Sequence, residues 1–462
     1  MTAVQRRVTY AICAIVGLTF LVSAGLTFLV SPMAEDLRFG DGMVETLLAL
    51  PSIASLLVIF VAGRFGDRLG HRRVLLVAGV AFSGGGCLLA VADGSVSVGV
   101  ALAVCGASAT AIQIVSFGLL QESVPDGRAH ISAFTTYGAV FPLAFLVLPV
   151  LTAGILEVSA WRWVPAVWAV GGVVVVLLAA LLLERGEATQ PLGEWGTLVL
   201  AGLALAAFVR IFDEIGNGRT QSFRVIAGLV VAPIALLACW WRMRAAAQPG
   251  FSLAPIRAAA VRLLLLGVMF VALLGLLTYA TLALEYLYGL TPLETSLAIV
   301  PAQLGAMVGA KVLASRAIHR WGPSRAARLM VFVFVVTVLS LLLMQPDTPA
   351  WVLVAGATLF SAADVAAITI LNTDVMALAP ADATGAVSAF RGAASAFGSA
   401  LGVLVLGSRV ISAVKSDPLE QCGHGRTDRP TDGRTARRRG RGLPARGGAL
   451  GGPDARRAAG AT

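Results

Sequence analysis

The stretch GRFGDRLGHRR, residues 63–73, separates two apolar segments, 43–62 and 74–92. Each segment is about as long as the roughly 20-residue helix that crosses a hydrocarbon core about 30 Å thick. The connection between them holds four arginines, one histidine, one aspartate and three glycines. A short, strongly basic connection between two such segments predicts a tight loop on the side of a membrane where positive charge collects.

The composition of the whole chain supports this interpretation. The 462 residues are 58% hydrophobic and only 13% charged, with a mean hydropathy of +0.85. Soluble proteins carry about 25% charged residues. The apolar runs lack the alternation of barrel strands, which predicts an all-α polytopic membrane protein. We predict thirteen spans, at residues 8–30, 43–62, 74–92, 97–120, 132–156, 164–183, 195–212, 224–241, 262–285, 295–314, 326–344, 350–374 and 388–411.

The distribution of arginines between the loops predicts the orientation. If the N-terminus faces the cytoplasm, most loop arginines, Arg391 among them, belong to the cytoplasmic side, and the outer loops hold only Arg38, Arg162, Arg219 and Arg224. This asymmetry is the one that cytoplasmic loops usually show. We therefore expect a multi-pass protein of the plasma membrane, the inner membrane of a bacterium, with a cytoplasmic N-terminus.

Cysteine usage and the lack of catalytic motifs limit the chemistry. Four of the five cysteines lie within predicted spans, and no CxxC pair or His/Cys cluster occurs. Such a pattern predicts no metal site, cofactor or disulfide framework. No nucleotide-binding motif or catalytic triad is present either, so we expect a protein that is not an enzyme.

The last part of the chain differs from the rest. Residues 415–462 are rich in Arg, Gly and Ala and carry 11 basic and 5 acidic groups. A basic tail can bind anionic lipid or nucleic acid, or can be disordered without a function. With thirteen spans this tail would lie outside, where basic residues are disfavoured. We favour a shift of reading frame near residues 412–418 with loss of a fourteenth span, and we expect no nucleic-acid partner.

The opening stretch has a second copy. The stretch SRAIHRWGPSR, residues 315–325, aligns with it at an offset of 252 residues. The aligned positions are Arg64 with Arg316, Arg68 with Arg320, Gly70 with Gly322 and Arg73 with Arg325. Two loops of one kind on one side of the membrane imply parallel repeats, an arrangement found in transporters whose halves move around a central site.

At this point a family resemblance can be stated. GRFGDRLGHRR resembles the G-x-L-A-D-R-x-G-R-R/K loop between the second and third spans of the major facilitator superfamily. The matching residues are Gly63, Asp67, Arg68, Gly70, Arg72 and Arg73. Asp67 could accept hydrogen bonds from the N-terminus of a helix in the other half, or pair with an arginine, and so act as a conformational latch. The alternative is that the arginines only fix the topology; His319 replaces the aspartate in the second copy, which predicts a weaker latch there.

Three further stretches narrow the resemblance to the fourteen-span drug:proton antiporters. They are SAWRWV at 159–164, QPGFSLAPIR at 248–257 and EYLYGLTPLETSLAIVPAQLG at 285–305. The resemblance implies a major facilitator fold with two six-helix halves and two extra central spans. The implied divisions are 1–186, 187–250, 251–414 and the tail 415–462.

The chain also departs from that family. Ser23 stands where the first span often has an aspartate, and Leu102 where the fourth span has an arginine. The fifth-span motif keeps only Gly138, Pro149 and Gly154, of which the proline could kink the helix and Gly154 could allow close packing. The family's proton-coupling residues therefore cannot be transferred to this chain.

Acidic residues inside spans are the remaining candidates for proton coupling, because charge in a bilayer is costly. Asp364 lies deepest, and Asp374 and Glu285 lie toward span ends. For Asp364 a coupling role and a structural, hydrogen-bonded carboxyl remain equally open. We expect Asp213 and Glu214 to be solvated in an outer loop.

Polar and aromatic residues on one helix face suggest a substrate cavity. Thr110, Gln113 and Phe117 share a face of the fourth span, and Asn372 lies within about 80° of Asp364 on the twelfth. A lining of this kind suits amphiphilic ligands. Hydrogen bonding between helices is the alternative role for Gln113.

These observations predict a monomeric, proton-coupled secondary transporter that exports a hydrophobic or amphiphilic small molecule by alternating access. As a drug-efflux antiporter it would confer resistance to an antibiotic or other drug; its partners would be the substrate, protons and the lipid bilayer. The alternatives are an exporter of an endogenous metabolite, a non-transporting membrane sensor, or an inactive truncated relative.

The frame shift can be checked by sequencing the coding DNA. Reading the genomic DNA across codons 412–418, and onward in the alternative frames, should restore an apolar run of about 20 residues, long enough for a fourteenth span. A sequence that keeps its present frame through this region would disprove the shift.

Overall fold

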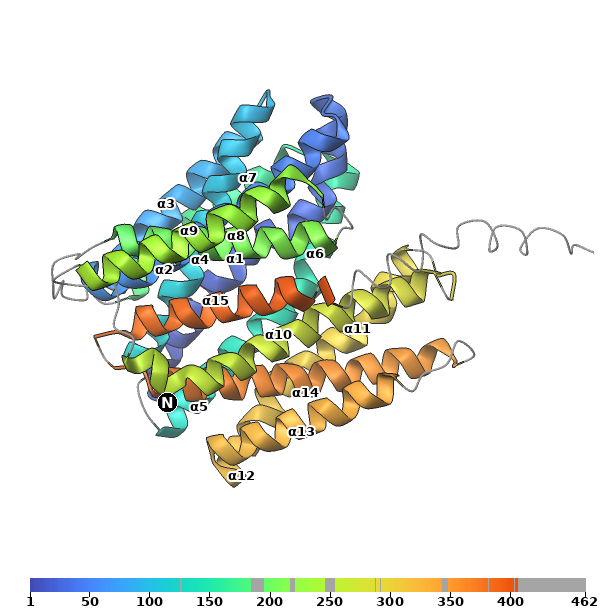
Figure 1. Ribbon diagram of the computed structural model, residues 1–462. Coiled ribbons are helices and arrows are strands. Elements are labelled where there is room, and N and C mark those ends of the chain that lie inside the picture. Colours follow the sequence, from blue (N-terminus) through green and yellow to red (C-terminus); the bar gives the residue numbers. More distant parts are fainter. Residues whose placement is uncertain are drawn as a thin grey trace, which may run out of the picture. The chain divides into compact units, whose positions relative to one another are not determined.

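The computed structural model describes residues 1–124, 127–183, 195–216, 221–245, 254–286, 288–290, 292–342, 348–380, 382–402 and 404–405. Every regular element in these ranges is a helix (Figure 1). The tail at 415–462 and the place of the proposed frame shift lie outside the described residues.

The first group of helices covers the predicted N-terminal half. Its members are α1 (Ala3–Asp36), α2 (Asp41–Leu69), α3 (His71–Ala90), α4 (Ser95–Ser123), α5 (Gly127–Gly138), α6 (Val140–Val158) and α7 (Trp163–Leu182). Their shared core surrounds large, fully buried side chains such as Phe82 and Trp168.

The second group covers the predicted C-terminal half. Its members are α10 (Ala254–Tyr286), α11 (Pro292–Val308), the π-helical segment η1 (Gly309–Leu313), α12 (Ala314–Trp321), α13 (Pro323–Leu342), α14 (Ala350–Ala377) and α15 (Thr384–Gly402). A core around Phe334 and Phe360 packs α10 to α14 together, whereas buried residues of α15 such as Val387 and Ala389 belong to the core of the first group. Between the groups in sequence, α8 (Gly196–Gly216) and α9 (Phe223–Ala245) pack against each other, and α8 also contacts α2 and α15.

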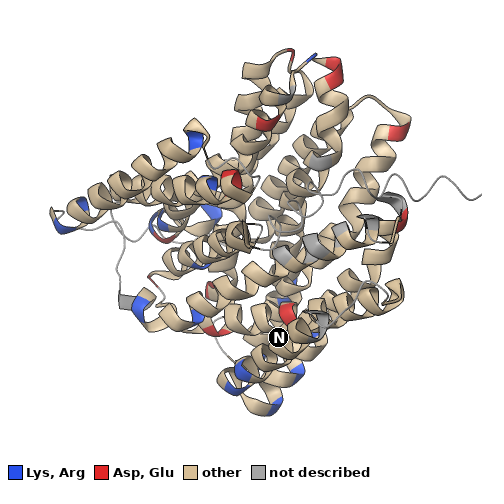
Figure 2. Cartoon of the chain, turned by 45° about the vertical axis from the view of Figure 1, so that its right-hand side comes forward, with Lys and Arg blue, Asp and Glu red and all other residues tan. Residues whose placement is uncertain are grey.

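The predicted spans and the observed helices agree. Where the structure describes them, all thirteen predicted spans coincide with helical structure. The span at 132–156 comprises α5 and α6, and the span at 295–314 comprises α11, η1 and part of α12. Within the described residues, ten helical segments are long and apolar enough to cross a membrane. Figure 2 shows that Lys, Arg, Asp and Glu lie mostly near helix ends and leave the middle stretches largely uncharged.

The break in the fifth span lies at Ala139, between α5 and α6, and not at Pro149. Pro142 explains the position, because a proline ring clashes with the carbonyl four residues earlier, which here belongs to Gly138. α6 continues through Pro149 to Val158. An added Cβ at Gly154 meets no atom within 4 Å, so close packing does not require that glycine.

Glu214 corrects the expectation of a solvated outer loop. It lies on α8 and is only 3% exposed. Arg210 Nη2 donates a hydrogen bond to Glu214 Oε1 at 2.8 Å, and Arg224 Nη1 on α9 donates to the same oxygen at 3.3 Å. Arg224 also reaches Glu45 on α2, at 3.3 Å. A buried carboxylate is tolerated when cations surround it, and this one joins the extra helix pair to the first group.

The two groups come closest at α2 and α15. A Cβ added to Gly63 would lie 2.3 Å from the carbonyl oxygen of Gly385, and one added to Gly385 would lie 2.2 Å from the carbonyl oxygen of Gly63. No side chain fits at either position without moving a backbone. We call the end of the bundle that holds 63–73 and 315–325 the latch end.

The contact between these glycines predicts the effect of a substitution. Gly63→Val should force α2 and α15 apart and cost about 1–3 kcal/mol, as overpacking does. Gly154→Val is the matched control, because it places the same side chain in open space. The melting temperature of each purified variant should fall for Gly63→Val and stay near that of the parent for Gly154→Val; equal melting temperatures would contradict the close contact.

Candidate functional site

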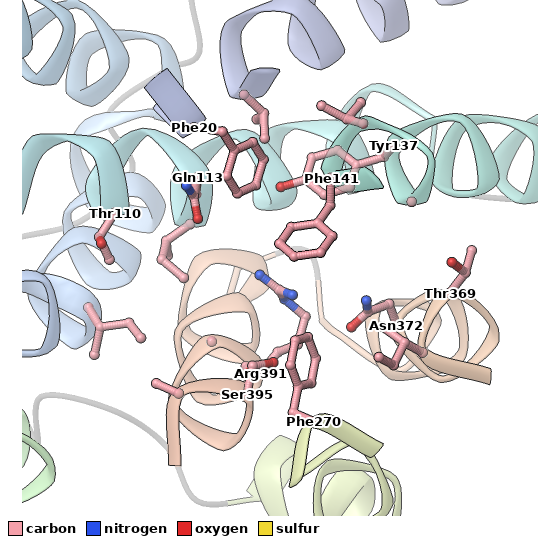
Figure 3. Close-up of a pocket in the computed structure, with 18 of the residues that line it drawn as sticks. Phe20, Thr110, Gln113, Tyr137, Phe141, Phe270, Thr369, Asn372, Arg391 and Ser395 are labelled. Atoms are coloured by element: carbon pink, nitrogen blue, oxygen red, sulfur yellow. Dashed lines mark hydrogen bonds between the residues drawn. The ribbon is translucent and has the colours of Figure 1, made fainter. Parts of the chain in front are cut away.

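A cavity of about 280 Å³ lies between the two groups of helices. Its walls come from α1, α2, α4, α5 and α6 on one side and from α10, α14 and α15 on the other (Figure 3). Both halves therefore contribute to one site, as expected of a transporter with a central binding site.

One wall of the cavity is aromatic. Phe20 on α1 packs edge-on against Phe141 on α6, with 5.5 Å between ring centroids. Tyr137 on α5 and Phe270 on α10 also line the space. Rings in this arrangement offer a large apolar surface to a ligand.

Few polar groups line the cavity, and some are without a partner. Gln113 Nε2 on α4 donates a hydrogen bond to Thr19 Oγ1 at 2.9 Å. On α14, Asn372 Oδ1 and Thr369 Oγ1 are buried and have no hydrogen-bond partner among the described atoms. Thr110 and Asn372, both predicted from the sequence, line the cavity together with Gln113. The fourth predicted residue, Phe117, is fully buried and is not among the lining residues.

Arg391 is the residue that the sequence analysis misplaced. It was counted with the cytoplasmic loops, but it lies on α15, well inside the helix, and lines the cavity. Its guanidinium carbon lies 4.0 Å from the centroid of the Phe117 ring, in a cation–π contact. Phe117 thus supports the cavity from behind Arg391. The signal that could have located it is its position inside the span predicted at 388–411.

The latch end is closed by Asp67. Asp67 Oδ1 accepts a hydrogen bond from the backbone N–H of Gly385 at 2.6 Å, and Oδ2 accepts one from Ala386 at 2.9 Å. These N–H groups belong to the first turn of α15, which has no intrahelical partners for them. Thr384 Oγ1 lies 3.5 Å from Asp67 Oδ1 and 3.3 Å from Glu122 Oε1. A carboxylate of one group of helices therefore caps a helix of the other.

Neighbouring residues of the same loop support this contact. His71 is buried, and its Nδ1 lies 2.9 Å from Glu122 Oε1 on α4. Gly70 ends α2 with φ = 87°, a conformation that favours glycine. Arg72 donates from Nε to the carbonyl of Ala179 and from Nη2 to that of Ala180, near the C-terminus of α7. These bonds hold the loop to its own group of helices.

The other basic residues of the loop make no hydrogen bond to the second group among the described residues. Arg68 is buried, the Nε of Arg64 has no partner among the described atoms, and Arg73 is exposed.

The second copy of the loop repeats the backbone but not the cap. Gly322 has φ = 74° and ends α12 as Gly70 ends α2. Arg316, Arg320 and Arg325 are exposed, as is His319 at the position of the aspartate.

Other groups join the halves near the second copy. Lys311 on η1 donates to the carbonyl of Ser132 at 3.4 Å and to the Thr136 hydroxyl, both on α5. His130 Nε2 on α5 lies 3.4 Å from the carbonyl oxygen of Thr373 on α14. The latch end therefore has contacts between the two groups near both copies of the loop, the first at 63–73 and the second at 315–325.

The three predicted carboxylates differ in their surroundings. Asp364 on α14 is 0% exposed, and neither of its oxygens has a hydrogen-bond partner among the described atoms. Asp374 accepts a bond from Arg262 Nε on α10. Glu285 belongs to α10, but its side chain lies outside the described residues. Asp364 is not a lining residue of the cavity, although Asn372 on the same helix is.

At the opposite end of the bundle, the SAWRWV element contacts the end of α1. Trp161 Nε1 donates a hydrogen bond to Asp36 Oδ2 at 2.9 Å, and Arg162 Nη1 donates to the same oxygen. These two bonds lower the pKa of Asp36, which lies beyond the apolar part of α1.

Two groups of membrane-length helices around a shared cavity define the class of secondary transporters. The sequence model of the Major Facilitator Superfamily matches residues 12–403, and the chain belongs to this family. It is a multi-pass membrane protein.

Relatives and solved structures agree with this classification. The uncharacterized MFS-type transporter Rv1877 of Mycobacterium tuberculosis is 26% identical over 68% of this chain and 47% of its own length, so the chain spans about half of that curated relative. The tetracenomycin C resistance and export protein of Streptomyces glaucescens is 23% identical over 82% of this chain and 71% of its own. The crystal structure of the human organic anion transporter MFSD10 has the same fold, with a TM-score of 0.63, 17% identity, and coverage of 87% of this chain and 93% of the other.

The cap on α15 predicts a local change in hydrogen exchange. Asp67→Asn removes the charge, and because a bond to a charged group contributes about 1.5–3 kcal/mol, exchange of the Gly385 and Ala386 amides should accelerate about tenfold or more. Mass spectrometry of the peptide that begins α15 measures this rate. Asp93→Asn is the control, since Asp93 is exposed and 3.7 Å from its nearest cation; unchanged exchange in Asp67→Asn would contradict the cap.

Proposed function

We propose that the protein exports a hydrophobic or amphiphilic small molecule, an antibiotic or other drug, by proton-coupled alternating access. The observation that carries this proposal is the cavity between the two groups, closed at the latch end by the Asp67 contact with α15. We further propose a monomer in the inner membrane of a bacterium, with the latch end and the N-terminus in the cytoplasm.

The contacts at the latch end suit a gate that opens. They join the two groups through hydrogen bonds between polar groups at one end of the bundle, so they can break while the apolar packing within each group stays in place. Asp67, Lys311 and His130 all reach across to polar backbone or hydroxyl groups, which water can replace. Closure at this end corresponds to an outward-facing state, and loss of these bonds would expose the cavity to the cytoplasm.

The lining of the cavity supports an amphiphilic substrate. Four aromatic residues present apolar surface, and Gln113, Asn372 and Thr110 offer a small number of polar contacts. Pockets built in this way bind drug-sized molecules and fix their orientation with the few polar groups.

Asp364 is our candidate for proton coupling. Asp374 already pairs with Arg262, whereas Asp364 is enclosed without a partner among the described atoms. A carboxyl that is enclosed in one conformation and reached by water in another can take up a proton on one side and release it on the other. The similarity to a protein named for antibiotic resistance and export supports the direction of transport and the substrate class.

Drug susceptibility of a host without its own exporters tests the proposal. Expression of the chain, with a frame-restored version beside it, should raise the inhibitory concentration of one class of amphiphilic compound severalfold, and an uncoupler should remove the effect. Asp364→Asn should abolish the resistance, because an amide cannot exchange a proton in this range. The control Glu157→Gln removes an exposed carboxylate from α6 and should have no effect.

Two results would contradict this proposal in different ways. Full resistance in Asp364→Asn would reject the coupling role but keep export. No resistance from any version, with insertion into the membrane verified, would favour a metabolite exporter or a non-transporting sensor.

A further inference from the structure

We propose that the ligand of the central cavity carries an anionic group on an aromatic or apolar body, and that Arg391 binds this group. The inference rests on the proposed function and narrows its substrate class. It follows from the charge that Arg391 brings to the cavity.

Arg391 brings a positive charge into the cavity that no carboxylate balances. Among the side chains that the structure describes, none forms a salt bridge with Arg391, and its buried Nε has no hydrogen-bond partner. The described carboxylates on neighbouring helices are otherwise placed: Asp364 is not a lining residue and Asp374 pairs with Arg262. Among the described residues that line the cavity there is no Asp or Glu.

The surroundings of Arg391 leave its charge available. Phe117 supports one face of the guanidinium through the cation–π contact at 4.0 Å. Figure 3 shows the guanidinium extending from α15 into the space between Phe141, Gln113 and Asn372. These neighbours are neutral: the amides of Gln113 and Asn372 can accept or donate hydrogen bonds, but none of the three side chains can neutralise the charge.

Physical chemistry then favours an anion as the missing partner. A cation taken from water into an apolar site is costly unless an opposite charge pairs with it. The planar guanidinium presents parallel N–H groups that match the two oxygens of a carboxylate or sulfonate. The aromatic wall of Phe20, Phe141 and Phe270 would hold the apolar body of the same molecule.

The alternative is a structural arginine whose only role is to pack on Phe117. In that case Arg391 would affect every ligand of the cavity to a similar degree, because it would act through the shape of the site. A role in charge recognition instead affects only ligands with a negative group. The two roles can therefore be separated with a pair of ligands that differ by one charge.

Anilinonaphthalene sulfonate and N-phenylnaphthylamine form such a pair, since they share one aromatic body and only the first carries a sulfonate. Binding of each would be measured by equilibrium dialysis on the full chain in nanodiscs of uncharged phosphatidylcholine, with empty nanodiscs subtracted. The variants are Arg391→Gln, Arg391→Lys and the control Arg328→Gln. Arg328 lies exposed on α13 and bonds only within its own helix, to the carbonyl of Ser324.

We expect the parent to bind the sulfonate more tightly than the neutral compound. Arg391→Gln should weaken sulfonate binding about tenfold or more, the size expected for a lost charged hydrogen bond, and change binding of the neutral compound less than about twofold. Arg391→Lys should retain part of the affinity for the sulfonate, and Arg328→Gln should retain all of it.

Three results would overturn the proposal: equal weakening of both compounds in Arg391→Gln, no change for the sulfonate, or no binding of the sulfonate by the parent. Because the assay measures binding without flux, it is independent of the export test. Failure of export with charge-selective binding intact would reject the transport proposal and keep this one.

Discussion

The cap that Asp67 places on α15 is the interaction on which the arrangement of the two halves depends. The first amides of a helix have no partners of their own, and the partial positive charge there attracts an anion. Here the anion comes from the other group of helices, and it can reach because Gly63 and Gly385 let the two backbones meet. The same carboxylate therefore completes a helix of one group and joins the two groups at the latch end.

The strength of this contact suits an interaction that forms in one conformation and breaks in another. Each bond to the charged carboxylate contributes about 1.5–3 kcal/mol, so two of them are comparable to the few kcal/mol that separate conformational states. Its position links it to the cavity as well. Arg391 follows Gly385 by six residues on α15, about 9 Å along the axis of a rigid helix. A movement of α15 that breaks the cap would move Arg391 with it.

Much of this fold could be predicted from the sequence, because hydropathy and the loop motif report on single segments. The thirteen spans, the repeat and the paired glycines Gly70 and Gly322 all belong to that level. Contacts between residues of different helices could not be predicted in this way. The arginines that surround Glu214 come from two helices, and the guanidinium of Arg391 packs on Phe117 of α4. Because both side chains are charged, the sequence suggested that Glu214 and Arg391 lie in solvent. In the fold, each is instead surrounded by specific neighbours from other helices.

Two helices of the second group, α14 and α15, each carry a residue of the cavity together with a charged or capped group outside it. α15 carries the capped amides at its start and Arg391 within it, while α14 carries Asp364 and, eight residues and about 12 Å on, the cavity residue Asn372. The family's first-span aspartate and fourth-span arginine are replaced here by Ser23 and Leu102. The charges at and near the cavity thus come from the second group, and the first group supplies the capping carboxylate and most of the aromatic wall. Under the proposed function, coupling of a proton, a ligand and the latch would depend on movement of α14 and α15 against the first group.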